Sequence, residues 1–245
     1  MIVPPQLVIV GSGIQVDRDL TPAACRHIES ADKVLFLVAD QIAVRTICEL
    51  NPTAESLHSL YRVGGSRMKT YRAMVELILS FVRAGKRVCV VAYGHPGFFA
   101  YPMHEAIRRA RREGYDALLL PGISSLDCLI SDLLLDPAER GIQVLDASMF
   151  LKRRGRVDPS ADLVLLQIAL TDQSRYQTEC DRDGLRRLID CLRKTYVARH
   201  PAVVYEASEF GVCQPSIQHV TIGAIGKAVI GLGSTLYVPP VGVSA

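Results

Sequence analysis

An apolar run that breaks abruptly into a glycine-rich turn is the feature that most limits how this chain can fold. Val88–Val91 is typical of a buried strand, and the turn Tyr93–Gly97, Tyr-Gly-His-Pro-Gly, follows almost at once. The turn continues neither a strand nor a helix, because glycine adopts backbone angles closed to other residues and proline fixes its own φ and offers no N–H. Open α/β sheets bind ligands at such turns, at the carboxyl ends of strands. A plain strand-to-helix connection is the alternative.

The first strand of the chain ends in a similar way. Leu7–Val10 is a short apolar run, and Gly11-Ser12-Gly13 follows it. Glycines at a strand end let a ligand approach the backbone closely. The motif is not the dinucleotide-binding fingerprint, because its third glycine is missing and no helix is expected directly behind it.

A third apolar run, Ala117–Leu120, turns into a helix through Pro121-Gly122-Ile123-Ser124-Ser125. Ser124 and Ser125 can cap that helix, and N–H groups at its start could also bind a carboxylate. Capping is the commoner use of such residues.

Strands and helices alternate in the first half of the chain, which predicts a mainly parallel sheet covered by helices. The predicted strands are Leu7–Val10, Lys33–Val38, Val88–Val91 and Ala117–Leu120. The predicted N-caps of the intervening helices include Thr21, Asp40 and Ser66.

The second half has more strands and one long predicted helix, about Arg182 to Tyr196, which indicates a mixed sheet in a second α+β domain. Gln167 is a polar residue at the end of an apolar strand, a ligand-facing position if that end is open. We expect an α/β fold of two domains, residues 1–121 and 122–245. The strands predicted here are Ile142–Leu145, Leu163–Ile168, Ala202–Tyr205, His219–Ile222 and Ser234–Val238.

A polar loop between residues 57 and 71 carries the side chains best suited to acid–base chemistry. It contains His58, Tyr61, Arg67 and Tyr71 around a Gly-Gly turn. Arg67 and Tyr71 are four residues apart, so they share one face of the helix that follows. An arginine beside a phenol favours the phenolate, which is a strong base. A Tyr–Arg stacking contact on the surface is the alternative interpretation.

Composition excludes several classes of function. The net charge of +3 is too small to indicate nucleic-acid binding, no apolar run approaches membrane-spanning length, and no secretory signal is visible at the N-terminus.

Seven scattered cysteines without a Cys-x-x-Cys pair suit reduced thiols in a cytoplasm. The six histidines are not at metal-ligand spacings, so no metal site is expected. Serine-hydrolase elbow, Walker and zinc-protease motifs are absent.

Taken together and in order, the glycine-rich strand ends and the strand carrying Gln167 resemble the tetrapyrrole methylase superfamily. The resemblance covers nearly the whole chain and implies a two-domain α/β methyltransferase that binds S-adenosylmethionine in a cleft between the domains. Within that superfamily, several further segments resemble the borosin peptide backbone α-N-methyltransferases. These segments are Ala31–Val34, Leu37–Asp40, Leu60–Tyr61, Arg67–Met68, Thr70–Tyr71, Tyr93–Gly97 and Gly233–Pro240.

The borosin resemblance implies methyl transfer to backbone amide nitrogens of a peptide. An amide nitrogen is a poor nucleophile because its lone pair is delocalised into the carbonyl. The enzyme must therefore accept the N–H proton and stabilise charge on the carbonyl oxygen. By the resemblance Tyr61, Arg67 and Tyr71 are catalytic, with either tyrosine as base or carbonyl donor and the arginine as charge partner. His58 joins them, at a position where fused borosins have another tyrosine.

The resemblance also assigns residues to the cofactor. S-adenosylmethionine would be converted to S-adenosylhomocysteine. The residues expected to bind it are Gly11, Gly13, Tyr93, Gly94, His95, Gly97, Ser124, Ser125, Gln167, Ser234 and Thr235.

Fused borosins continue into a helical segment and the peptide that they methylate, whereas this sequence stops five residues after Pro240, at Ala245. The expected arrangement is therefore split, with a separate precursor peptide modified in trans. The family also implies a homodimer whose subunits complete each other's sites.

Two other functions fit the superfamily. A methyltransferase of tetrapyrrole carbons would share fold and cofactor, but such enzymes usually carry aspartate where His95 stands and lack the loop with Tyr61, Arg67 and Tyr71. A non-catalytic, nucleotide-binding regulatory module would have no need of Arg67 and Tyr71, and both are present.

Overall fold

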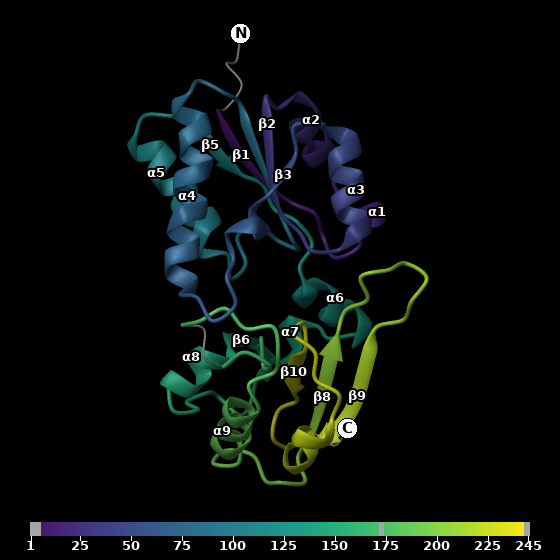
Figure 1. Ribbon diagram of the computed structural model, residues 1–245. Helices are drawn as coiled ribbons and strands as arrows, with labels where there is room; N and C mark the ends of the chain where they lie inside the picture. Colours follow the sequence, from purple (N-terminus) through teal and green to yellow (C-terminus); the bar gives the residue numbers. More distant parts are fainter. Residues whose placement is uncertain (1–5, 172–173, 243–245) are drawn as a thin grey trace. The chain divides into compact units, whose positions relative to one another are not determined.

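The computed structural model describes residues 6–171 and 174–242 and forms two compact units. The first extends to Asp127 and includes Ser208–Cys213; the second comprises Cys128–Ala207 and the chain from Gln214 onward. The predictions about an N-terminal signal and about the chain's end concern residues 1–5 and 243–245, which lie outside the described residues. Each unit contains one five-stranded sheet (Figure 1).

The alternating pattern predicts a mainly parallel sheet, and the sheet of the first unit is entirely parallel. Its strand order is β3-β2-β4-β1-β5. Its short edge strand β3 is polar and carries no apolar signal in the sequence. The strands are β1 (Leu7–Gly11), β2 (Lys33–Leu37), β3 (Glu55–Ser56), β4 (Val88–Ala92) and β5 (Ala117–Leu119).

Helices connect these strands, and the predicted caps are confirmed. The side chains of Thr21, Asp40 and Ser66 accept hydrogen bonds from backbone N–H groups at the starts of α2, α3 and α4. The four-residue α1, which was not predicted, begins at Val16, after Ile14 and Gln15. The elements are α1 (Val16–Asp19), α2 (Pro22–Ser30), α3 (Gln41–Leu50), the 3-10 helix η1 (Leu57–Leu60), α4 (Arg67–Arg83), α5 (Tyr101–Arg112) and α6 (Ser125–Asp132).

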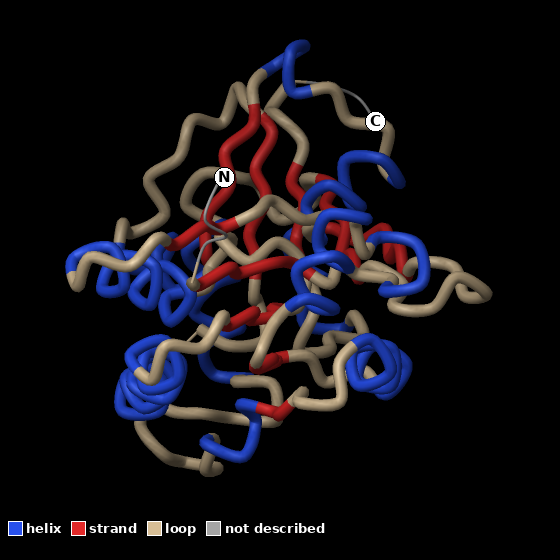
Figure 2. The backbone as a smooth tube through the Cα atoms, turned by 90° about the horizontal axis from the view of Figure 1, so that it is seen from above, coloured by secondary structure: helices blue, strands red, loops and turns tan. Residues whose placement is uncertain are grey.

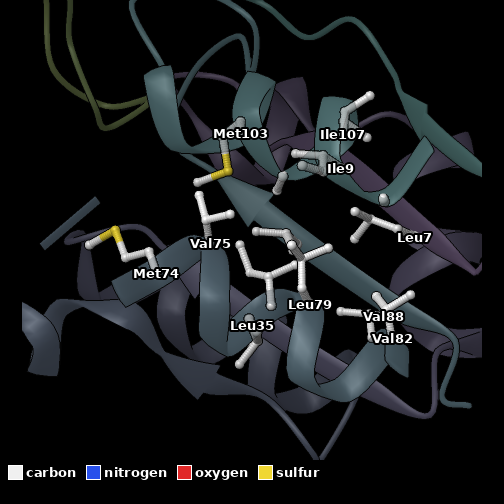
Figure 3. Close-up of a cluster of buried hydrophobic side chains, with 14 of the residues drawn as sticks. Leu7, Ile9, Leu35, Met74, Val75, Leu79, Val82, Val88, Met103 and Ile107 are labelled. Atoms are coloured by element: carbon white, nitrogen blue, oxygen red, sulfur yellow. The ribbon is translucent and has the colours of Figure 1, made fainter. Parts of the chain in front are cut away.

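Both faces of this sheet are covered, because successive side chains of a strand point to opposite sides. In β1, Leu7 and Ile9 pack with α4 and α5, whereas Val8 and Val10 pack with α2 and α3. Figure 3 shows the first cluster, in which Val75, Leu79 and Val82 of α4 and Met103 and Ile107 of α5 pack with Leu7 and Ile9 of β1. Figure 2 views the chain from above and shows helices (blue) flanking strands (red).

The second unit has a mixed sheet, as predicted, and its strand order is β6-β7-β10-β8-β9. Only β6 and β7 run parallel, while β10 pairs antiparallel with both β7 and β8. Its strands are β6 (Ile142–Asp146), β7 (Asp162–Leu166), β8 (Pro201–Glu206), β9 (Ser216–Thr221) and β10 (Thr235–Val238). Its helices are α7 (Pro137–Arg140), α8 (Ala147–Lys152), α9 (Arg182–Leu192) and the 3-10 helix η2 (Ile222–Lys227).

Within the described residues, none of the helices has the length and apolarity needed to cross a membrane. All seven cysteines are free thiols.

Three glycines bring the backbones at the ends of β1, β4 and β5 into contact. A Cβ on Gly11 would lie 2.2 Å from the carbonyl oxygen of Gly94 and 3.2 Å from Gly122 Cα. A Cβ on Gly122 would lie 2.9 Å from the same oxygen. The turn after β5 therefore belongs to the first unit, which is why that unit extends to Asp127 and not only to residue 121.

We expect Gly11→Ala to lower the free energy of unfolding by about 1–3 kcal/mol, because the new methyl group overlaps backbone that cannot move freely. Gly226→Ala is the control, since its Cβ would meet only Ile189 Cδ1 at 3.7 Å. The control should change stability by less than about 0.5 kcal/mol. Urea unfolding followed by circular dichroism measures both, and equal midpoints for the two variants would contradict the packing argument.

Candidate functional site

The turns after β1 and β4 lie at the topological switch point of the first sheet. β1 and β4 are neighbours, yet the chain leaves β1 towards β2 and leaves β4 towards β5, on opposite sides. Ligands of open α/β sheets bind at the carboxyl ends of strands at such a point. Both glycine-rich turns predicted from the sequence stand there.

Hydrogen bonds hold the two turns together. The Gly94 N–H donates to the Gly13 carbonyl at 3.1 Å, and the Ser12 N–H donates to the Ala92 carbonyl at 2.8 Å. Gly13 and Gly94 have φ of +70° and +66°, a region that other residues rarely adopt. The glycines at these positions are therefore required by backbone conformation.

Asp19 organises the first turn and was missed by sequence reasoning. One of its carboxylate oxygens accepts from the N–H groups of Ile14 (3.1 Å) and Gln15 (2.9 Å), and the other pairs with Arg18. The residue is only 3 % exposed. A Cβ on Gly13 would lie 2.0 Å from the Asp19 Cβ, which adds a steric reason for that glycine. A lone aspartate six residues later carries no motif that could have revealed this role.

The second turn orients His95 and leaves Tyr93 accessible. His95 Nδ1 accepts from the Gly97 N–H at 3.0 Å, so the neutral imidazole carries its proton on Nε2. The Gly97 carbonyl in turn lies 2.7 Å from His104 Nε2. Tyr93 is 42 % exposed at the end of β4. This turn thus presents one aromatic face and one imidazole donor.

Ser124 caps α6 in a reciprocal arrangement with Asp127. Its N–H and hydroxyl donate to the Asp127 carboxylate at 2.7 and 2.6 Å, and its hydroxyl oxygen accepts from the Asp127 N–H at 3.3 Å. Ser124 is therefore a cap, as the sequence predicted, and its N–H already donates to the Asp127 carboxylate. Ser125 is the first residue of α6.

The structure brings together all four residues of the predicted catalytic loop. Arg67 Nε donates to the Tyr71 hydroxyl at 2.9 Å, and its guanidinium carbon lies 5.5 Å from that ring's centroid. The ring of Tyr61 lies edge-on to Tyr71 at 6.4 Å, and His58 lies 5.9 Å from Tyr61. Tyr101, at the start of α5, stacks on Tyr71 at 6.1 Å and was not predicted.

His58 has an unusual environment for a polar side chain. Its Nε2 atom is buried and has no hydrogen-bond partner among the described residues. Burial lowers the pKa of the imidazole below its ordinary value of 6.5, because the charged form loses hydration. Burial therefore favours the neutral imidazole at His58.

In the second unit, Gln167, Ser234 and Thr235 meet at one end of the sheet. Gln167 follows β7 with φ of +57°, and the Ile168 N–H donates to the Ser234 carbonyl at 3.4 Å. Ser234 donates through its hydroxyl to Glu206 at 2.8 Å and accepts from the Gly231 N–H. Sequence reasoning missed Glu206, which lies at the end of β8 with no motif around it.

The predicted site residues thus fall into three groups within the two units. The first unit holds the strand-end turns and the catalytic loop, and the second holds the cluster of Gln167, Ser234, Thr235 and Glu206. No group of histidine, cysteine and acidic side chains in the described segments could hold a metal ion. The arrangement offers backbone N–H and carbonyl groups, a phenol–guanidinium pair and a neutral imidazole.

Sequence comparisons agree with the predicted resemblance at both levels. A model of the family described as "Tetrapyrrole (Corrin/Porphyrin) Methylases" matches residues 6–225. A "methyltransferase/ribosomally synthesized cyclic peptide dendrothelin A precursor" from Dendrothele bispora is 38% identical over 97% of this chain and 58% of its own length. A type I borosin cyclic peptide precursor of the same kind from Coprinopsis marcescibilis is also 38% identical, over 98% of this chain and 63% of its own. The chain thus spans about three fifths of these relatives.

Among solved structures, uroporphyrin-III-C-methyltransferase from Thermus thermophilus is similar with a TM-score of 0.68. The match covers 96% of this chain and 92% of that one at 18% identity. This similarity shows the fold, and the predicted fold class is confirmed.

We expect the His58 imidazole to titrate below pH 6.5, because its burial favours the neutral form. As pH falls from 6.5 towards this lower pKa, the unfolded state binds more protons, so the protein should lose stability that a His58→Gln variant retains. Carbon–proton correlation spectra of the histidine rings measure the midpoint, with the variant identifying the signal. A midpoint at or above 6.5 would contradict this account of the site.

Proposed function

Since the chain belongs to the tetrapyrrole methylase family, we propose that it is an S-adenosylmethionine-dependent methyltransferase that methylates backbone amide nitrogens of a peptide. The observation that carries the proposal is the hydrogen bond from Arg67 Nε to the Tyr71 hydroxyl, with Tyr61 and His58 beside it. The printed names of the curated relatives, which join a methyltransferase to a ribosomally synthesized cyclic peptide precursor, support a peptide substrate.

Amide methylation requires a base and a donor to the carbonyl oxygen. The guanidinium of Arg67 donates a hydrogen bond to the Tyr71 oxygen, and we assign Tyr71 as the group that accepts the amide proton. We assign Tyr61, whose ring lies edge-on to that of Tyr71, as the donor to the substrate's carbonyl oxygen, where negative charge develops as the N–H bond breaks. The neutral His58 is a second donor next to Tyr61.

S-adenosylmethionine supplies the methyl group as a sulfonium electrophile, and the products are the N-methylated amide and S-adenosylhomocysteine. The position of the glycine turns supports binding of this cofactor, because they follow β1 and β4 at their carboxyl ends, where open α/β sheets bind ligands. Carbonyl oxygens suit a positive sulfonium without requiring acidic side chains. The binding set is that predicted from the sequence: Gly11, Gly13, Tyr93, Gly94, His95, Gly97, Ser124, Ser125, Gln167, Ser234 and Thr235.

The remaining parts of the proposal concern the protein's partners and compartment. The substrate is a separate precursor peptide modified in trans, and the enzyme is a homodimer whose subunits complete each other's sites. Seven free cysteines suit a reducing compartment such as the cytoplasm.

Incubation with S-adenosylmethionine and the peptide encoded beside this chain's gene should add one or more units of about 14 Da. Tandem mass spectrometry should place them on backbone nitrogens. Tyr71→Phe should lower the methylation rate by roughly 10²–10⁴-fold, because a phenyl ring cannot accept the proton. Arg67→Leu should have a similar effect. S-adenosylhomocysteine binding, measured by calorimetry, should be unchanged in both.

Tyr115→Phe provides the matched control, since Tyr115 packs beside the same core but lies outside the loop. Full peptide methylation by Tyr71→Phe with intact cofactor binding would refute its role as base. Methylation of a porphyrinoid and of no peptide would refute the proposed substrate.

Shared sites in a dimer predict complementation between two inactive variants. His95→Ala should bind S-adenosylhomocysteine more weakly, and Tyr71→Phe should bind it normally. After the two are unfolded together and refolded, a mixed dimer has one site with both defects and one with neither. About a quarter of the wild-type rate should therefore return. Size-exclusion chromatography with light scattering should show that the refolded mixture is dimeric. If a dimeric mixture recovers no methylation activity, the subunits do not share sites.

A further inference from the structure

A pocket of about 410 Å³ lies within the first unit and includes none of the residues assigned to catalysis or cofactor. Its walls are α1, the start of α3 and the segment 209–212. That segment comes from the connection between β8 and β9 and is far from α1 and α3 in the chain, so sequence order gives no indication of the pocket.

Specific contacts hold the segment against α1. Gln15 donates through its side-chain amide to the Ser208 carbonyl at 3.0 Å, and the Ser208 hydroxyl donates to the Phe210 carbonyl at 2.8 Å. A Cβ on Gly211 would lie 3.7 Å from Asp17 Oδ2. The segment is therefore held at Ser208 by Gln15, the residue before α1, and Gly211 lies near Asp17.

The charged groups of the pocket are all acidic. Asp17, Asp40 and Glu209 line it, and no lysine, arginine or histidine does. Asp40 uses one oxygen to accept from the Ala43 N–H at the start of α3. Within the described part of the chain, no ion pair joins any of these three carboxylates to a basic side chain. In a chain of net charge +3, this gathering of negative charge favours a cationic partner.

Apolar side chains stand beside the carboxylates. Ile42, Phe210 and Val212 are 51%, 41% and 96% exposed. Exposed apolar residues scattered singly need no explanation, but three around one pocket leave apolar surface that a partner would cover. Arginine and lysine match both features, because a hydrocarbon stem carries the cationic head.

We infer that this pocket docks a basic, partly apolar segment of another polypeptide. The charged head of an arginine or lysine lies among Asp17, Asp40 and Glu209, and its stem with a neighbouring apolar side chain covers Ile42 and Phe210. A small polyamine would neutralise the carboxylates but leave the apolar side chains in water. A peptide that alternates basic and apolar residues meets both requirements. The inference does not depend on the chemistry of methyl transfer.

Titration of the ¹⁵N-labelled full chain with two synthetic peptides tests this inference. The first is acetyl-Ile-Arg-Val-Arg-Phe-Gly-amide, and the second has glutamate in place of both arginines. The basic peptide should shift the N–H signals of residues 16–17, 41–42 and 209–212 and reach saturation. The acidic peptide should not shift them. Equal shifts from both peptides, or none from the basic one, would overturn the inference.

Charge reversal supplies the second arm. Asp17→Lys with Glu209→Lys should weaken binding of the basic peptide by about tenfold or more, since both acids are exposed and hold no structural contact. Asp17→Asn with Glu209→Gln keeps the side-chain size and should weaken it in the same direction. Glu29→Lys, an exposed acid on α2, is the control and should leave binding unchanged.

Two further outcomes would identify a different occupant and overturn the inference. Spermidine binding to the same signals as tightly as the peptide would indicate a polyamine site. Concentration-dependent shifts of the same signals without any peptide would indicate that a second copy of this chain covers the pocket.

Discussion

The close approach of three glycine backbones is the constraint on which the first unit depends. Gly11, Gly94 and Gly122 end or follow β1, β4 and β5, and the missing side chains let these turns touch. A residue with a Cβ at Gly11 would separate the turns that the topology brings to the switch point. Because the turn after β5 is held in this contact, the start of α6 is positioned as well. The turns of the proposed methyl-donor site are thus positioned mainly by contacts between backbones.

Two carboxylates satisfy N–H groups within these turns. Asp19 accepts from the turn after β1, and Asp127 accepts from Ser124 at the start of α6. Buried or half-buried N–H groups without acceptors are costly, so these aspartates stabilise turns that have no regular structure. They also limit which N–H groups remain for a ligand. The catalytic loop is different, because its central contact is local to one helical turn: Arg67 and Tyr71 are four residues apart on α4.

Local signals in the sequence predicted local structure well. Thr21, Asp40 and Ser66 each precede an amphipathic helix, so the sequence predicted them as N-caps. Each side chain accepts the expected hydrogen bond. The glycine-rich strand ends and the Arg67–Tyr71 pair were predicted for the same reason. Asp19, Glu206 and Tyr101 were missed, because each acts on residues that no short motif connects to it. The wall at 208–213 was missed because its contacts are almost 200 residues away in the chain.

By itself, the sequence determined most of the strands, the parallel and mixed character of the two sheets, and the residue types at the strand ends. Periodicity, capping and glycine placement are properties of neighbouring residues, so they can be recognised without coordinates. The tertiary structure decided which turns touch, which side chains accept their N–H groups, and which distant segment closes the acidic pocket. These depend on strand order and on packing between residues far apart in the chain. Neither is encoded in any single stretch.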